Sequence, residues 1–328
     1  MRLIYIIIVL FFLSVQGNSQ QMYTKNQPFA HTYSIVARDT VTGEMGVAVQ
    51  SHWFSVGSIV SWGKAGVGVV ATQSFVNPSF GPRGLSLLEN GMTPKMAVKS
   101  LLELDEGRDV RQLAILDVHG NVEAYTGKSC IEAAGHQMGN NFSVQANLME
   151  KNTVWPAMAK AFENSSGSLA ERMLTSMEAA QNEGGDIRGK QSVAILVVKE
   201  KSSGNSWEDR VVDLRIEDHK TPLKEMRRIL NIHKAYDFMN KGDLAVETGN
   251  NDLAKEHYRQ AQILNPDNLE MKYWYAITLA NNGDLEEAKT ILKDIFRQNN
   301  QWKVLIPRLI KPKLLLISDK DLQEILKL

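Results

Sequence analysis

Between residues 33 and 216, short bursts of apolar residues are separated by turn-forming residues, a pattern that predicts β-strands. The runs "YSIVA" and "GVAVQS" lie on either side of Thr42 and Gly43 and predict a β-hairpin. A second hairpin is predicted in "RQLAILDVHGNVEAYTG", with residues 119–121 at its turn. Further strands are predicted in "GVGVVATQS", "NFSVQANL", "SVAILVV" and "DRVVDLRI".

Helices are predicted in two blocks between these strands. The first block is residues 82–90 and 93–105, where Thr93 is a good N-cap and Pro94 suits the first helical position. The second block is residues 153–163 and 169–183. Because strands and helices come in blocks rather than in strict alternation, we expect an α+β domain of antiparallel sheets covered by helices, over residues 32–217.

From residue 218 onward the chain is predicted to be helical to its end. Residues 218–236 would form a linking helix. "GNNDLAKEHYRQA" and "GDLEEAKTILKDI" then align at a period of 34 residues, which is the tetratricopeptide length. In this alignment Gly249 falls on Gly283 and Ala254 on Ala288. Residues 237–328 are therefore interpreted as a tetratricopeptide-like module with capping helices.

The first residues of the chain resemble an export signal. Arg2 precedes a nearly unbroken apolar run over residues 3–15, and Gly17 or Ser19 supplies a small residue for cleavage. The run is shorter than the roughly 20 residues of a membrane span. We expect a signal peptide over residues 1–19, a disordered polar leader over 20–31, and a periplasmic or secreted mature chain without a membrane span.

The composition excludes several classes of protein. Thirty-seven Lys and Arg residues balance 37 Asp and Glu residues, so no overall charge favours nucleic acid as a partner. Cys130 is the one cysteine of the sequence, and no intrachain disulfide can form. No histidine or cysteine spacing is typical of a metal site. We therefore expect neither a metal nor another cofactor.

Two polar loops supply candidate substrate-binding residues. "QSFVNPSFGPRG" carries Gln73, Asn77 and Arg83, whose donors suit an oxyanion or a carboxylate. A purely structural alternative is that Asn77 forms a turn before Pro78 while Arg83 faces solvent. The second loop, "GGDIRGKQS", adds the candidates Asp186, Arg188 and Gln191. It resembles a phosphate-binding loop, but a helix precedes it and a strand follows, which is the reverse of the order that such a loop requires.

Cys130 and His136 lie close in the sequence and raise the hypothesis of a thiol nucleophile with an imidazole base. Catalytic pairs of this kind normally come from distant segments, and a single cysteine is more often a small buried apolar residue. His136 is retained as a candidate that lines a substrate site.

Thr32 opens the first predicted strand and is the candidate nucleophile. The hydroxyl of a chain's first residue can be activated by its own α-amine, whose pKa lies near 8. While Thr32 is internal, its nitrogen belongs to an amide and this mechanism fails. The alternative is an ordinary strand threonine.

These segments, taken together and in order, resemble the domain-of-unknown-function 1028 (DUF1028) family. The resemblance extends from about residue 32 to 236 and rests on "TYSIVARD", "GKAGVGVVATQSFVNPSFGPRG", "TGKSCIEAAGH" and "GGDIRGKQSVAILVV". It implies a four-layer αββα sandwich similar to N-terminal-nucleophile (Ntn) hydrolases. It also implies that Thr32 matches a residue that often stands near the N-terminus of family members. Here a signal cleavage would leave residues before Thr32, so a second cut is required.

Two functions follow as hypotheses. The first is an exported Ntn-hydrolase-like enzyme acting on an amide or peptide, with Thr32 as nucleophile and the polar loop residues lining the cleft. The second is a non-catalytic binding or scaffold protein of the cell envelope, whose helical repeats hold a protein partner. Use of Cys130 as the nucleophile is a third, enzymatic alternative.

Overall fold

The computed structural model describes residues 29–328, and they form two compact units, the first ending at Leu223 and the second spanning Lys224–Leu328. The predicted signal peptide lies outside the described residues. Helix α7 (Pro222–Glu247) is one helix of 26 residues and passes through position 237, where the repeat module was expected to begin. The chain contains no proline between Pro222 and the end of α7, so nothing stops the helix at the expected boundary.

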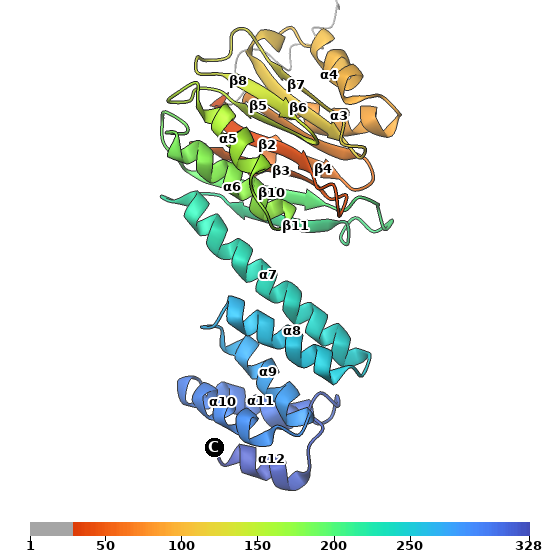
Figure 1. Cartoon of the computed structure of the whole chain (residues 1–328), viewed down its shortest axis with the longest axis vertical. Coiled ribbons are helices and arrows are strands. Elements are labelled where there is room, and N and C mark those ends of the chain that lie inside the picture. Colours follow the sequence, from red (N-terminus) through yellow and green to blue (C-terminus); the bar gives the residue numbers. More distant parts are fainter. Residues whose placement is uncertain (1–28) are drawn as a thin grey trace, which may run out of the picture. The chain divides into compact units, whose positions relative to one another are not determined.

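Two antiparallel sheets make up the centre of the first unit, in the part of the chain that the structure describes (Figure 1). In one sheet the order is β1 (Phe29–Ala30), β5 (Gly68–Phe75), β6 (Arg111–Asp117) and β7 (Val122–Thr126), and β4 (Ser61–Lys64) also pairs with β5. In the other the order is β11 (Arg210–Ile216), β10 (Ser192–Val198), β3 (Met45–Ser51), β2 (Thr32–Arg38), β9 (Phe142–Ala146) and β8 (Gly135–Gly139).

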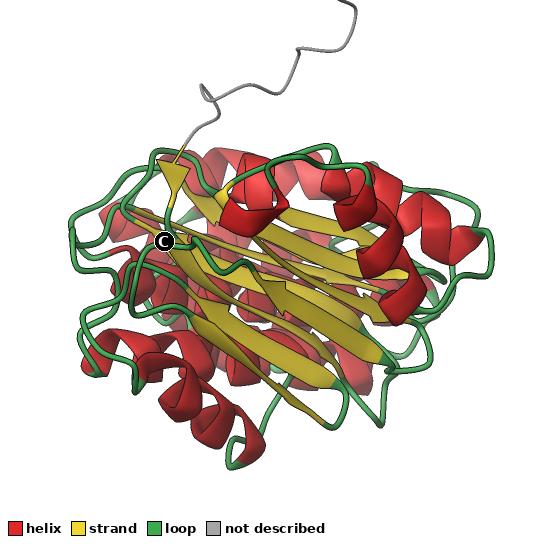
Figure 2. Ribbon diagram, turned by 90° about the horizontal axis from the view of Figure 1, so that it is seen from above, coloured by secondary structure: helices red, strands yellow, loops and turns green. Residues whose placement is uncertain are grey.

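Helices cover the outer face of each sheet. Helices α3 (Phe80–Glu89) and α4 (Pro94–Glu103) pack on the sheet that contains β5 and β6, and the short η1 (Arg108–Val110) precedes β6. Helices α5 (Val154–Glu163) and α6 (Leu169–Asn182) pack on the sheet that contains β2 and β3. The layered α+β arrangement agrees with the blocks of strands and helices in the sequence, and Figure 2 shows the strands enclosed by helices.

The β5 strand shows why the apolar runs are nearly continuous. Val69 and Ala71 are buried between the two sheets, together with Val47 and Leu116. Val70, which points to the other face, is buried among residues of α3 and α4. A strand buried on both faces needs apolar residues at successive positions rather than a strict alternation.

The end of the predicted disordered leader is ordered. Phe29 pairs with Phe75, and Ala30 pairs with Ser74, at the edge of the first sheet. His31 follows and is only 3% exposed. The expectation of a disordered leader is therefore wrong for these last residues, because β5 offers a free edge for backbone pairing. The rest of that leader lies outside the described residues.

The second unit consists of packed helices. After α7 come α8 (Asn251–Leu264), α9 (Leu269–Asn281), α10 (Leu285–Gln298), α11 (Gln301–Leu305), η2 (Ile306–Leu309) and α12 (Asp319–Leu326). The repeat positions Ala254 and Ala288 are both fully buried in its core. Gly242 of α7 packs so closely on Tyr258 that a Cβ atom at this position would meet the tyrosine ring. Within the described residues, no helix is both long and apolar enough to cross a membrane.

Candidate functional site

Thr32 is the first residue of β2 and is fully buried. It lies opposite Ser51, the last residue of β3. Its carbonyl oxygen accepts hydrogen bonds from the backbone nitrogen of Asn147 at 3.1 Å and from Gln73 Nε2 at 3.2 Å. Donors from both sheets thus hold the backbone of Thr32 in place.

The peptide bond that precedes Thr32 is held by two further donors. The carbonyl oxygen of His31 accepts a hydrogen bond of 2.6 Å from Ser51 Oγ and one of 2.8 Å from Arg188 Nη2. The buried His31 ring lies edge-on to Phe75, with 5.7 Å between ring centroids. A hydroxyl and a guanidinium at one carbonyl oxygen are the kind of donors that stabilise developing negative charge.

The loop between α6 and β10 positions Arg188. Asp186 is 2% exposed, and its Oδ1 accepts from the backbone nitrogen and Nε of Arg188 at 2.9 and 3.0 Å. Its Oδ2 accepts from Arg188 Nη2 at 2.7 Å and from the His52 backbone nitrogen at 3.1 Å. Gly185 and Gly189 have φ angles of +68° and +115°, which favour glycine. The glycine-rich loop therefore orients a guanidinium, and the ion pair has fixed geometry.

Buried amide side chains connect the two sheets beside Thr32. Gln73 Nε2 donates to Gln112 Oε1 at 2.7 Å, and Gln112 Nε2 donates to the carbonyl oxygen of Ala146 at 2.9 Å. Ser34 Oγ donates to Gln73 Oε1 and accepts from Gln145 Nε2 at 2.6 Å. Because backbone carbonyls can only accept, these contacts fix which end of Gln73 and Gln112 is the nitrogen.

The same network reaches two histidines and places a proton on one of them. Asn147 Nδ2 donates to Gln112 Oε1 at 2.9 Å, so Asn147 Oδ1 accepts from His31 Nδ1 at 2.8 Å and His31 carries its proton there. At the opposite end, Thr126 Oγ1 accepts from Gln112 Nε2 at 2.9 Å and lies 2.8 Å from His136 Nδ1.

Burial lowers the pKa of both histidines. For His31 burial is the main cause, and Arg188 adds to it, while the hydrogen bond to Asn147 and the charge of Asp186 act in the opposite direction. For His136 burial is again the main cause, and Glu123 opposes it. Both rings are thus biased toward the neutral form.

A cavity of about 630 Å³ lies at the His136 end of this network. Thr126, Cys130, His136 and Asn152 are among its lining residues. Burial raises the pKa of the Cys130 thiol, whose sulfur donates to the carbonyl oxygen of Arg111 at 3.3 Å. A thiol with a raised pKa is a poor nucleophile at neutral pH, which disfavours the hypothesis that Cys130 is catalytic.

The structure separates the predicted site residues into two groups. Thr32, Gln73, Asp186 and Arg188 meet at one end of the sheets, and His136 joins them through Gln112 and Thr126. The other three predicted residues, Asn77, Arg83 and Gln191, have different contacts.

Asn77 is buried, and its Oδ1 accepts from the backbone nitrogen and the hydroxyl of Ser79 at the start of α3, as the turn alternative predicted. Arg83 is exposed on α3, with its Cζ 6.0 Å from the Phe80 ring centroid. Gln191 donates to Asp218 at 3.1 Å. None of these contacts involves Thr32.

Sequence reasoning missed Ser51, Gln112, Gln145 and Asn147. A usable signal existed, because "RQLAILD" and "FSVQANL" place amides inside apolar strands, where an uncompensated polar group would be costly. Ser74 was also missed. It is fully buried and has a φ of +72°. Such a backbone conformation at a serine cannot be read from the sequence.

Over residues 29–328, no cluster of three or more His, Cys, Asp or Glu side chains is placed to hold a metal ion. The chemistry available at this site consists of hydroxyls, amides, imidazoles, a thiol and the Asp186–Arg188 ion pair.

Comparisons with known proteins identify relatives of both units. Residues 32–226 match the model of a family of unknown function, DUF1028, and residues 245–305 match a tetratricopeptide repeat model. The crystal structure of protein SPO2555 from Silicibacter pomeroyi, which is assigned to DUF1028, is 31% identical with a TM-score of 0.56. The match covers 61% of this chain and 85% of that one. No curated protein matches the chain.

Proposed function

The chain belongs to the DUF1028 family, and we propose that its first unit is an Ntn-hydrolase-like enzyme that acts on an amide or peptide with Thr32 as nucleophile. The layered sheets and helices, with Thr32 at the start of a central strand, support this assignment. In the intact chain the nitrogen of Thr32 is an amide nitrogen, which cannot serve as a base. The proposal therefore includes cleavage of the His31–Thr32 bond by the protein itself.

The observation that carries the proposal is the environment of the His31 carbonyl oxygen. Ser51 Oγ and Arg188 Nη2 donate to it at 2.6 and 2.8 Å. When a nucleophile adds to the carbonyl carbon, the negative charge develops on this oxygen, and preorganised donors lower the barrier. The buried Asp186 holds the guanidinium, so little reorganisation is needed.

The cleavage balances with water as the one added reactant. The Thr32 hydroxyl oxygen bonds to the His31 carbonyl carbon, closing a five-membered ring, and the hydroxyl proton passes to the Thr32 nitrogen as the C–N bond breaks. The product is an ester with a free α-amine. Water then hydrolyses the ester, which returns the threonine hydroxyl and leaves a carboxylate on His31.

After the cut, the same donors serve a substrate. The carbonyl group of an amide substrate takes the place of the His31 carbonyl, so Ser51 and Arg188 stabilise its oxyanion. The new α-amine of Thr32, with a pKa near 8, accepts the hydroxyl proton as Oγ1 attacks. We further propose that the enzyme is exported and works in the periplasm or outside the cell.

Mass spectrometry of the purified full chain during incubation tests the proposal directly. We expect a new species whose first residue is Thr32, and a second fragment that ends at His31. Thr32→Ala should abolish the cut, whereas Thr32→Ser should retain it because the hydroxyl remains. A cut that persists in Thr32→Ala, or hydrolysis of amides by protein with an intact His31–Thr32 bond, would overturn the mechanism.

A further inference from the structure

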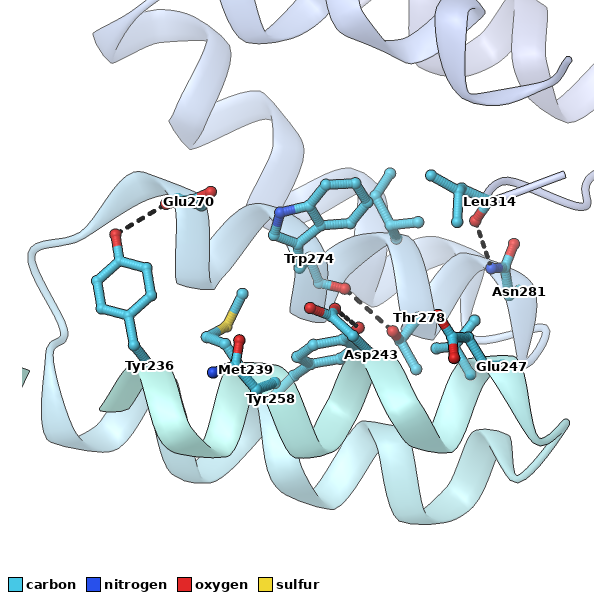
Figure 3. Close-up of a pocket in the computed structure, with 13 residues that line it drawn as sticks. Tyr236, Met239, Asp243, Glu247, Tyr258, Glu270, Trp274, Thr278, Asn281 and Leu314 are labelled. Atoms are coloured by element: carbon cyan, nitrogen blue, oxygen red, sulfur yellow. Dashed lines mark hydrogen bonds between the residues drawn. The ribbon is translucent and has the colours of Figure 1, made fainter. Parts of the chain in front are cut away.

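A groove in the second unit lies between α7 and α9 and encloses about 480 Å³ (Figure 3). Successive turns of α7 present Tyr236, Asn240, Asp243 and Glu247 to it. This spacing of three to four residues places all four side chains on one face of the helix. One face of α7 therefore forms a continuous side of the groove.

The lining of the groove carries negative charge. Asp243 and Glu247 come from α7 and Glu270 from α9, and within the described part of the chain no Lys or Arg is among the lining residues. The hydroxyl of Tyr258 donates to Asp243 at 2.6 Å and that of Tyr236 to Glu270 at 2.9 Å (Figure 3). These neutral partners leave the charge of both carboxylates uncompensated.

The carboxylate of Glu247 is exposed and has no hydrogen-bond or ion-pair partner among residues 29–328. It lies one helical turn from Asp243, and like charges at this spacing destabilise a helix. Nearby cations are engaged elsewhere: Lys241 pairs with Asp237, and Lys255 pairs with Asp284. The free module thus retains a repulsion that a bound cation would relieve.

Aromatic and aliphatic groups lie beside these carboxylates. Trp274 of α9 lines the groove together with Met239 of α7 (Figure 3). Ile277 is a further apolar lining residue. The alkyl stem of a lysine or arginine packs on such surfaces while its charged end reaches a carboxylate or an aromatic face. At one end, Asn281 donates to the carbonyl oxygen of Leu314 at 2.9 Å, and this contact fixes Leu314 in the lining.

We propose that this groove binds a segment of a partner protein that carries lysine or arginine side chains spaced by apolar residues. The cations pair with Asp243, Glu247 and Glu270, and the apolar residues pack beside Trp274. An acidic segment would face three like charges, so the charge of the groove selects against it. This inference does not depend on any chemistry at Thr32.

Fluorescence anisotropy on the full chain tests the proposal with two labelled peptides that alternate leucine with either lysine or glutamate. We expect binding of the lysine peptide alone, and weaker binding as salt is added. The double variant Asp243→Asn/Glu247→Gln should weaken binding by about tenfold, because two charge contacts are lost. Glu270→Gln should weaken it further.

The matched control is Glu163→Gln/Asp267→Asn, which removes two exposed carboxylates outside the groove and changes the net charge equally. It should bind as the parent chain does, and circular dichroism should show all variants equally helical. The proposal is overturned if neither peptide binds, if the glutamate peptide binds as well, or if control and groove variants lose affinity alike.

Discussion

The guanidinium of Arg188 donates a 2.8 Å hydrogen bond to the carbonyl oxygen of His31, a residue 157 positions earlier in the chain. This contact joins the loop before β10 to the residue before β2. Since Asp186 holds the same guanidinium at 2.7 Å, the donor is in position before any charge develops on the oxygen.

Replacement of Arg188 should slow self-cleavage while leaving the fold intact. Arg188→Gln removes the charged donor, and the loss of one oxyanion donor typically lowers a rate by roughly 10²- to 10³-fold. The rate is measured from the ratio of intact to cut chain by mass spectrometry over time. Arg188→Lys keeps the positive charge but loses the paired donors of the guanidinium. Its cleavage rate should lie between those of the parent chain and Arg188→Gln. Equal rates in all three proteins would contradict this role.

Asp105→Ala should destabilise the first unit strongly. The Asp105–Arg111 pair is 2.7 Å long with side chains only 8% and 3% exposed, so the change leaves a buried cation without its partner. The free energy of unfolding, measured in urea, should fall by about 3–5 kcal/mol. Asp109→Asn breaks the exposed pair with Lys128 and serves as the control, with an expected change under about 1 kcal/mol. Similar effects of the two variants would refute the argument.

Stability should decrease as the solution becomes acidic. The pKa of His31 and that of His136 are lowered from 6.5 in the folded state, so the unfolded chain binds more protons below that pH. The free energy of unfolding should be highest above pH 6.5 and fall as the pH drops toward the lowered values. His136→Gln should flatten this slope, whereas His119→Gln, at an exposed turn, should not. A slope unchanged by His136→Gln would count against a buried neutral imidazole.

Cys130 should be dispensable for cleavage. Its buried thiol has a raised pKa and is held by the carbonyl oxygen of Arg111, so little thiolate forms at neutral pH. Cys130→Ser is expected to process the His31–Thr32 bond at a rate within about twofold of the parent chain. If this substitution abolished cleavage while Thr32→Ala spared it, the thiol mechanism would replace the one proposed.

Gly242→Ala should destabilise the helical unit. In an exposed helix interior the same change stabilises by about 1 kcal/mol, but here the added methyl group would meet the Tyr258 ring. Overpacking of this kind costs roughly 1–3 kcal/mol, so the sign of the effect is diagnostic. Thermal unfolding followed by circular dichroism at 222 nm should show a melting temperature that is lower by about a few degrees. A rise in the melting temperature would show that α7 and α8 pack less tightly than described.

Much of the fold was predictable because buried strands and helix ends require particular residue types at particular positions. The apolar run at Val69–Ala71 predicted β5, and Thr93 with Pro94 predicted the start of α4, whose N-cap the structure confirms. The strands β1, β4 and β8 were missed. β8 reads "GHQMG", in which no alternation is visible, and its existence depends on the neighbouring β9.

The candidate site was predictable only in part. The glycine-rich loop drew attention to Asp186 and Arg188, and Gln73 was identified as a polar residue beside a strand end. That Ser51 donates to the His31 carbonyl follows from the register of β2 and β3, which no local pattern specifies. Arg83 was misleading because an arginine in a Gly- and Pro-rich stretch looks the same whether it faces a cleft or solvent.

On the proposed mechanism, the short ladder between Phe29–Ala30 and β5 would make cleavage of the chain and opening of the site two separate events. A cut segment would stay docked, its new carboxylate gripped by Arg188, and would plug the very place a substrate must occupy. Freshly processed protein would then show a lag before turnover, shortened by dilution and prolonged by adding the segment back. Such a lag would separate the synthesis of the chain from the onset of the proposed activity.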